Sequence, residues 1–448
     1  MTCQLTGQKL KISIGQIFNP LRGDVPVPHA VNQIIIKLRP GYTLQSLGLS
    51  SHYSLLESEE NISSYLLFIT GISETQALQE LNAKPGVAFA ELNTILHVFF
   101  EPNDPLWTYQ YGPTNIQCPA AWDTERGEHT VVVSVIDTGI DYTHSDLVNC
   151  YRAFGSWNFV ARNGNPLDDN GHGTHCAGII AAETNNGIGI AGIANVQIMS
   201  MKAISSDGTG YIWTVARAIV RSALFGADII SMSLGASPFW QPRLLWLACN
   251  FSYALGVTIV AAAGNDGTEW LDYPARFPCV ISVGATDSNN ERAPFSNYWE
   301  SLDVVAPGVD IISTMPTYHV ALNDPPYSIP MYYANLSGTS MACPHCVGVL
   351  ALYFSKNGVT VSNEKAKECL HESAIDLGDP GYDKYYGYGL VNAYGILQYD
   401  DSSDGGDGGQ GHHVGGPSGG AIKVQGISII PGAEMLIQGM DQHRQGTV

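Results

Sequence analysis

The stretch at residues 336–345 reads LSGTSMACPH, and the apolar run 346–354 follows it directly. Small polar residues and a glycine ahead of continuous apolar character predict a turn that leads into a buried helix. Ser340 would then lie in the first turn, where unpaired backbone N–H groups and the helix dipole favour negative charge. We expect Pro344 to lie in the same turn, where its missing N–H is tolerated. Ser340 is therefore a candidate nucleophile, with helix capping as the plain alternative.

A serine nucleophile needs a base and a carboxylate that orients the base, and two further stretches offer them. The apolar run 131–136 predicts a strand buried on both faces of a parallel sheet, with Asp137 at its carboxyl end. The stretch 170–178 contains His172 and His175 and opens a second helix of small residues. Sites in open α/β sheets lie at the carboxyl ends of strands. Asp, His and Ser also occur here in a chain order known for catalytic triads.

Together these stretches resemble the subtilisin-like serine proteases, and their pattern is closest to the thermitase-type branch of that family. The resemblance extends from about Asn103 to Tyr394. It implies an α/β fold with a mostly parallel central sheet and helices on both faces, preceded by a small α+β prodomain.

The resemblance assigns catalytic roles to four residues. Ser340 is expected to be the nucleophile, His172 the general base and Asp137 the group that orients the imidazole. Spacing alone does not separate His172 from His175, but the resemblance aligns the former with the base. It places Asn265 in the oxyanion hole, beside the backbone N–H of Ser340. From the residues alone, a turn role for Asn265 and a zinc site that uses both histidines with Asp137 are the alternatives.

An extended peptide substrate pairs with strand edges, and the resemblance names two stretches for this role. They comprise Ser233, Leu234 and Gly235, and Gly208, Thr209 and Gly210. The specificity pocket is expected to contain Gly264, with Asp266 at its rim and Asp272 near its base. A buried carboxylate favours a substrate cation, whereas the expected maturation site at 97–100 offers aromatic and aliphatic residues. We therefore expect broad apolar or aromatic specificity, with a secondary preference for Lys or Arg as the alternative.

A structural calcium ion is also implied by the resemblance. The loop 184–190 is expected to bind it together with two carboxylates, through Thr184, Asn186, Ile188, Ile190, Asp104 and Asp146. Such an all-oxygen ligand set suits this cation. The Asn-Gly sequence in the loop is also typical of a simple turn.

Four parts are expected along the chain. Residues 1–28 form a leader without a clear role, and 29–99 form a small α+β unit that resembles an inhibitory prodomain. Its predicted elements are strands at 32–41, 64–69 and 87–92 and a helix after the capping box 73–76. The catalytic domain is expected at 100–398, after a Pro-broken linker suited to cleavage, with strands at 197–202, 228–234, 257–263 and 280–284 and helices at 213–225 and 244–255. Residues 399–448 are expected to be a Gly/Asp-rich flexible tail.

Composition excludes several kinds of partner. The formal charge is −20, and phosphate binding needs a basic face, so no nucleic-acid partner is expected. No segment is apolar over the length that a membrane span requires, and we expect a monomer. Of the nine cysteines, Cys176, Cys343 and Cys346 are expected to be buried packing thiols. Relatives of this type are often secreted, but the amino terminus lacks the apolar core of a signal peptide, so secretion and a cytoplasmic location both stay open.

The function expected from these motifs is that of a serine endopeptidase. It would cleave polypeptides through an acyl-enzyme and would be made as a self-processing zymogen, with calcium as a structural cofactor and its own prodomain as inhibitor. A peptide ligase or macrocyclase, or a specific proprotein-processing protease, could use the same triad and stays an alternative. An inactive binding relative is disfavoured because every triad residue is present.

Overall fold

The computed structural model describes residues 12–19, 23–94, 100–236 and 239–399. An amino-terminal unit and a larger α/β domain follow one another along the chain, and each is described by itself. The expected maturation site at 97–100 lies outside the described residues except for Phe100, and so does the expected tail from residue 400 onwards.

The amino-terminal unit is a five-stranded antiparallel sheet with one helix. Its strands are β1 (Ile12–Asn19), β2 (Gly23–Leu38), β3 (Tyr53–Glu59), β4 (Ser64–Ile69) and β5 (Val87–Thr94), and the helix is α1 (Glu74–Asn82). They run in the order β1-β2-β4-β3, with β5 paired to β2. Ser73 caps α1 by accepting a hydrogen bond from the Gln76 amide, as the capping box predicts. Ile34, Ile36 and Leu81 are fully buried between sheet and helix, so this unit has a small core of its own.

One predicted boundary is wrong. The sequence pattern predicts a leader that ends at residue 28, but β2 begins at Gly23 and pairs with β1 through residue 30. Pro26 and Pro28 hide the strand pattern, because proline lacks the N–H that a ladder uses and is confined to special strand positions. The small unit therefore has two more strands than its sequence pattern predicts, β1 and β3.

The larger domain is built on a seven-stranded sheet in the order β12-β11-β10-β9-β6-β8-β7, and all its pairs are parallel. The strands are β6 (Val132–Asp137), β7 (Trp157–Asn158), β8 (Gln197–Lys202), β9 (Ile229–Met232), β10 (Thr258–Ala262), β11 (Ile281–Thr286) and β12 (Val304–Pro307). Each predicted core strand is present with ends within two residues. A separate antiparallel pair comprises β13 (Ile311–Thr314) and β14 (Tyr333–Leu336).

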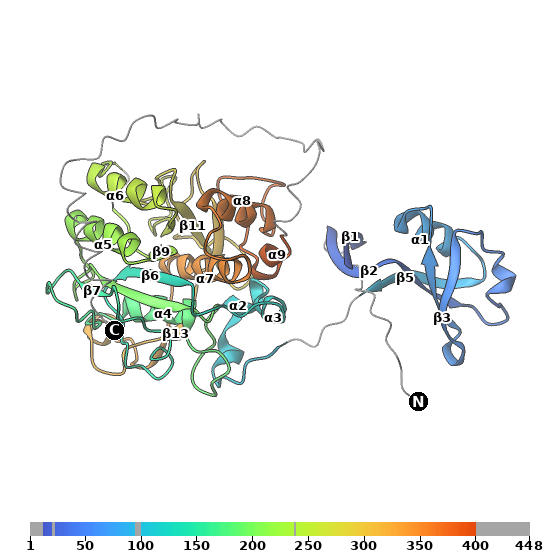
Figure 1. Cartoon of the computed structure of the whole chain (residues 1–448), viewed down its shortest axis with the longest axis horizontal. Helices are drawn as coiled ribbons and strands as arrows, with labels where there is room; N and C mark the ends of the chain where they lie inside the picture. Colours follow the sequence, from blue (N-terminus) through green and yellow to red (C-terminus); the bar gives the residue numbers. More distant parts are fainter. Residues whose placement is uncertain (1–11, 20–22, 95–99, 237–238, 400–448) are drawn as a thin grey trace, which may run out of the picture. The chain divides into compact units, whose positions relative to one another are not determined.

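Helices cover both faces of the sheet, as predicted (Figure 1). Along β6, Val133 and Val135 join the core on the side of α4 and α7, whereas Val132 and Ile136 join the core on the side of α5 and α6. This alternation is the two-residue period of a strand buried on both faces. The long helices are α4 (His172–Ala181), α5 (Ile212–Leu224), α6 (Arg243–Ala254), α7 (Thr339–Asn357) and α8 (Asn363–Ser373), and the short ones are α2 (Tyr111–Asn115), α3 (Cys118–Trp122) and α9 (Ala393–Leu397).

Helix α7 corrects the expected place of Pro344. The helix begins at Thr339, so Ser340 is in the first turn as predicted, but Pro344 lies in the second turn. A proline there removes the hydrogen bond that its N–H would give to the carbonyl of Ser340, four residues earlier. That carbonyl accepts side-chain hydrogen bonds instead, from Ser233 Oγ at 2.8 Å and from Cys176 Sγ at 3.5 Å. The proline thus frees an acceptor that joins α7 to its neighbours at the site.

The cysteines of the described segments are all free thiols, and Cys176, Cys343 and Cys346 are buried, as expected. No helix in these segments is long and apolar enough to cross a membrane.

Candidate active site

The predicted catalytic residues meet at the carboxyl edge of the parallel sheet. Asp137 ends β6, and Ser233 and Asn265 follow β9 and β10. His172 is the first residue of α4, and Ser340 is the second residue of α7. The parallel strands bring together segments that are far apart along the chain, since Asp137 and Ser340 are separated by 203 positions.

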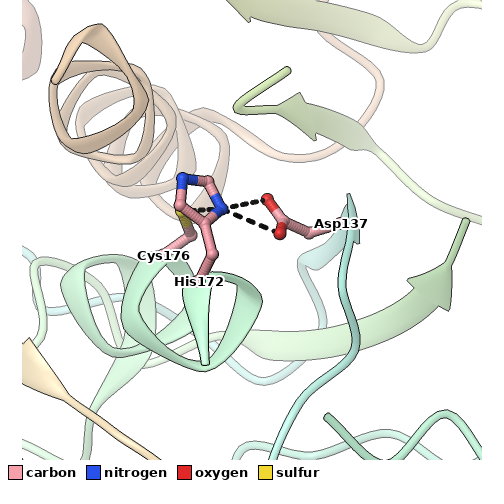
Figure 2. A group of neighbouring side chains, drawn as sticks. All are labelled: Asp137, His172 and Cys176. Atoms are coloured by element: carbon pink, nitrogen blue, oxygen red, sulfur yellow. Dashed lines mark hydrogen bonds and ion pairs between the residues drawn. The ribbon is translucent and has the colours of Figure 1, made fainter. Parts of the chain in front are cut away.

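Asp137 and His172 form a close pair (Figure 2). The ring nitrogen Nδ1 of His172 lies 2.9 Å from Asp137 Oδ1 and 3.1 Å from Oδ2. Only 3% of the Asp137 side chain is exposed, whereas 26% of the His172 side chain is. The Thr138 amide also donates to Asp137 Oδ1, at 2.7 Å. The carboxylate is therefore held in place, and the opposite ring nitrogen of His172 is left for another partner.

The electrostatics separate the two candidate histidines. Burial by itself lowers the pKa of His172, but the adjacent Asp137 carboxylate raises it, and the net pKa lies well above the ordinary value for histidine. Burial and the neighbouring His172 charge lower the pKa of His175 to about 3. His175 Nε2 contacts the carbonyls of Ile311 at 3.0 Å and Ala334 at 3.1 Å. His175 is therefore a neutral structural residue that links α4 to β13 and β14.

Ser340 is held next to this pair. Its hydroxyl donates to the carbonyl of Ser233 at 3.3 Å. The Cys176 thiol lies 3.5 Å from the Ser340 carbonyl and 3.9 Å from His172 Nδ1, so α4 and α7 hold the two groups close together. Among the hydrogen bonds of the described residues, none joins the Ser340 hydroxyl to the His172 ring. Contacts of this kind often tighten only when substrate is bound.

The side chain of Asn265, the predicted oxyanion donor, is held in one orientation. Its Oδ1 accepts hydrogen bonds from the Thr339 amide at 2.8 Å and from Thr339 Oγ1 at 3.0 Å. These two hydrogen bonds hold Oδ1 of Asn265 against Thr339, so Nδ2 of the same amide points away from Thr339. Nδ2 lies 3.5 Å from the position that a Cβ would take on Gly338, two residues before Ser340. Asn265 is exposed, so Nδ2 can meet a ligand.

A groove with a volume of about 420 Å³ leads from His172 and Asp137 across the sheet edge. Five of the six residues predicted to pair with a substrate backbone line it: Gly208, Gly210, Ser233, Leu234 and Gly235. Thr209 is not among its lining residues, and its hydroxyl and amide both donate to the Asp207 side chain.

The expected specificity pocket contains an unpaired carboxylate. Asp272 is half-buried, and its backbone amide donates to the carbonyl of Ala263 at 3.0 Å. A Cβ on Gly235 or Gly264 would lie 2.8 Å or 2.7 Å from Asp272 Oδ2, so the carboxylate occupies the space that both glycines leave. Gly264 also has a φ of +109°, which other residues rarely adopt.

The charge state of this pocket follows from its environment. No donor among the described residues bonds to the Asp272 side chain. Burial is the larger cause and the nearby Asp266 charge the smaller one, and together they raise the pKa of Asp272 to about 6. Asp266 itself is exposed, at the rim as expected. The pocket therefore holds a carboxylate that ionises only near neutral pH unless a cation is present.

The alternative zinc site is not assembled by the two histidines. Potential metal ligands do cluster at Asp137, His172 and Cys176, within 4.8 Å of one another. However, Asp137 already bonds to His172, and burial raises the pKa of the Cys176 thiol. The cluster is thus a hydrogen-bonded network of a carboxylate, an imidazole and a protonated thiol.

The residues of the expected calcium site do come together. Asp104 accepts hydrogen bonds from the amides of Asn185 and Asn186, and Asp146 accepts one from the Asn186 side chain at 2.9 Å. Both carboxylates are buried, and burial raises the pKa of each. Among the described residues, no donor contacts the expected carbonyl ligands, which are those of Thr184, Ile188 and Ile190. Two buried carboxylates beside free carbonyls fit a hard divalent cation.

Sequence reasoning missed several residues of the site. Asp168 accepts hydrogen bonds from Thr138 Oγ1 at 2.9 Å and from the Thr174 amide at 3.0 Å, so it ties the strand of Asp137 to the first turn of α4. Thr339 orients Asn265, and Asn170 joins His172 to the neighbouring groove wall through the carbonyl of Ser206. The one sequence signal for Asp168 is its place just before α4, because an acidic side chain near the start of a helix interacts favourably with the helix dipole.

Comparison with known proteins agrees with this geometry. The Subtilase family (peptidase S8) matches residues 128–389. Thermitase of Thermoactinomyces vulgaris is 40% identical over 302 residues, which is 67% of this chain and all of the relative. A thermophilic serine proteinase of Bacillus sp. (strain AK1) is 39% identical over 324 residues, which is 72% of this chain and 75% of the relative.

Two solved structures are also similar. One is a protease of Pseudoalteromonas arctica PAMC 21717, with a TM-score of 0.59 and 27% identity over 66% of this chain and 98% of the relative. The other is a lanthipeptide protease, with a TM-score of 0.59 and 26% identity over 67% of this chain and 99% of the relative.

Proposed function

The chain belongs to the subtilase family of subtilisin-like serine endopeptidases, and from this premise we propose that it hydrolyses peptide bonds with a triad of Ser340, His172 and Asp137. The observation that carries the proposal is the buried Asp137 carboxylate bonded to Nδ1 of His172, with Ser340 held beside them at the first turn of α7.

In the first half of the reaction, Ser340 Oγ attacks the scissile carbonyl carbon and His172 Nε2 takes the hydroxyl proton. Asp137 holds the ring with its Nδ1 proton inward and stabilises the imidazolium. The carbonyl oxygen gains negative charge and accepts hydrogen bonds from Asn265 Nδ2 and the Ser340 amide. His172 then gives the proton to the leaving amine, and an acyl-enzyme remains.

In the second half, water replaces the amine. His172 takes a proton from this water as it attacks the ester carbonyl, and returns the proton to Ser340 Oγ when the acid product leaves. The substrate lies extended along Gly208–Gly210 and Ser233–Gly235, whose glycines allow close backbone approach.

The experiment for this proposal is the Ser340→Ala variant, assayed on a denatured protein mixture by identification of new termini. We expect no new termini from Ser340→Ala and full cleavage by the control Ser337→Ala, since Ser337 is an exposed serine of the same stretch. Normal cleavage by Ser340→Ala would reject the triad. Adding a peptide nucleophile separates hydrolysis from ligation, because a ligase would give spliced products in the mass spectrum.

The protein is also proposed to be a self-processing zymogen. The compact amino-terminal unit supports this, because a core of its own lets it fold as a separate unit. We propose that this unit inhibits the enzyme until it is released. Purified Ser340→Ala should then keep this unit attached, whereas the wild type releases it. Release by the variant would assign processing to another protease.

Calcium is the proposed structural cofactor, since subtilases are generally calcium-binding. Asp104, Asp146 and Asn186 would hold the ion together with the carbonyls of loop 184–190, and the ion would neutralise two buried carboxylates. It stabilises the fold and takes no part in bond cleavage.

A further inference from the structure

The connection between β13 and β14 is far longer than the pairing of these strands requires. Thr314 and Tyr333 are directly opposite each other, yet the chain between them runs through residues 315–332. Hairpin loops usually have about 2–5 residues, and long loops in compact domains are commonly functional. We call this segment the 315–332 loop. Beyond it, β14 leads directly to Ser340.

The 315–332 loop has a fixed shape. Asn323 accepts a hydrogen bond from the Val320 amide and donates one to the carbonyl of Ile329, both at 2.7 Å. These bonds tie the two arms of the loop across the short 3₁₀ helix Ala321–Asn323. At the start of the loop, the amide and hydroxyl of Thr317 donate to Asp141 Oδ2 at 2.9 and 2.8 Å. The loop can therefore present side chains in defined positions.

The loop rests on the segment that leads into His172. The Ala321 amide donates to the carbonyl of Asp169 and the Leu322 amide to the carbonyl of Asn170, both at 3.1 Å. A Cβ on Gly171 would lie 3.6 Å from Leu322 Cδ1. The loop thus packs against the backbone immediately before the catalytic base.

Three residues of the loop line the substrate groove: Ala321, Leu322 and Tyr327. They lie on the same groove as His172 and Asn170, and 65% of Tyr327 is exposed. Successive side chains of an extended substrate point to opposite sides. If the scissile residue points into the pocket at Gly235 and Gly264, the residue before it points towards the wall that carries His172 and the loop.

We propose that the 315–332 loop selects the substrate residue that precedes the scissile residue, and that Leu322 and Tyr327 favour an apolar side chain there. The wall they add is apolar and aromatic, and it lies directly beside the catalytic base. A polar or absent side chain at that position leaves this surface in contact with water. The inference rests on the proposed endopeptidase function and adds a substrate preference to it.

The test uses the mature enzyme and a series of peptide substrates that differ only in the residue before the scissile residue. For wild type we expect kcat/KM with leucine or phenylalanine at this position to exceed that with glycine by about tenfold, the lower range for one apolar contact in a pocket. In Tyr327→Ala and Leu322→Ala this ratio should fall several-fold. The control is Tyr332→Ala, an exposed tyrosine of the same loop that does not line the groove, and it should keep the wild-type ratio.

Two results would overturn the inference. An unchanged ratio in both groove variants would show that the loop does not contact the substrate residue. An equal loss of kcat/KM for every substrate would show that the loop only positions the His172 segment. Neither result bears on the triad, which the Ser340→Ala experiment tests separately.

Discussion

Neutralising Asp272 should change which residue the enzyme accepts at the cleavage point. Its carboxylate lies between Gly235 and Gly264, and none of the described residues donates a hydrogen bond to it, so a substrate Lys or Arg would be its partner. A hydrogen bond to a charged group contributes about 1.5–3 kcal/mol, and the half-exposed position favours the lower end. Since about 1.4 kcal/mol is tenfold, Asp272→Asn should lower kcat/KM for Lys and Arg substrates, relative to Phe, by about tenfold.

The effect should also depend on pH. The pKa of Asp272 is raised to about 6 by burial and then by Asp266, so the carboxylate is mostly neutral below that pH and mostly ionised above it. The Lys-to-Phe ratio of kcat/KM, which reports free enzyme, should therefore rise roughly tenfold from about pH 5 to pH 7. His172 titrates equally for both substrates and cancels in the ratio. The control Asp266→Asn removes one cause of the raised pKa, so it should move the midpoint to lower pH and keep the preference at neutral pH.

The assay is a substrate series that differs only at the scissile residue, measured on wild type and both variants. If Asp272→Asn leaves the Lys-to-Phe ratio unchanged at every pH, Asp272 does not contact the substrate side chain. Broad apolar specificity alone would then describe the pocket.

Three further predictions concern the oxyanion hole, the calcium site and the base. Asn265→Ala should lower kcat by roughly a hundred- to thousand-fold with little change in KM, and an unchanged kcat would exclude Asn265 as the oxyanion donor. Chelation should remove about 2.7 kcal/mol of stability relative to calcium at a hundred times its dissociation constant. At that same calcium concentration the loss should grow as pH rises, because Asp104 and Asp146, whose pKa values are raised by burial, ionise and the dissociation constant falls. An equal melting temperature with calcium and with chelator would contradict the site. Asp137→Asn should lower kcat by about 10⁴-fold. It should also move the acid limb of the pH profile of kcat/KM to lower pH, because the Asp137 carboxylate raises the pKa of His172. An acid limb that does not move would show that a group other than His172 controls this limb.

The sequence predicted those parts of the site that depend on local pattern. The run 131–136 is apolar except for Ser134 because both faces of β6 are buried, and that pattern alone places Asp137 at the sheet edge. The turn before Ser340 and the capping box at Ser73 are also local, and both are present.

The sequence did not predict features that depend on distant contacts. Asp168 carries no sequence signal beyond its place ahead of α4, because its partner Thr138 follows β6 and lies 30 residues earlier in the chain. The sequence pattern predicts Pro344 in the first turn, but it does not fix the first residue of the helix. The helix begins at Thr339, so Pro344 lies in the second turn. The hairpin of β1 and β2 was missed because two prolines break its pattern. The place of the 315–332 loop depends on its docking before His172, which no periodicity reveals.

In the proposed mechanism, Ser340 is the nucleophile and His172 activates it. The most direct measurement is to inactivate the wild-type enzyme with a serine-reactive phosphonate and to map the adduct by mass spectrometry of peptides. We expect one stoichiometric adduct, on Ser340, and no adduct in His172→Ala at the same reagent concentration. Complete inactivation with Ser340 unmodified, or equally fast labelling of Ser340 in His172→Ala, would contradict this mechanism.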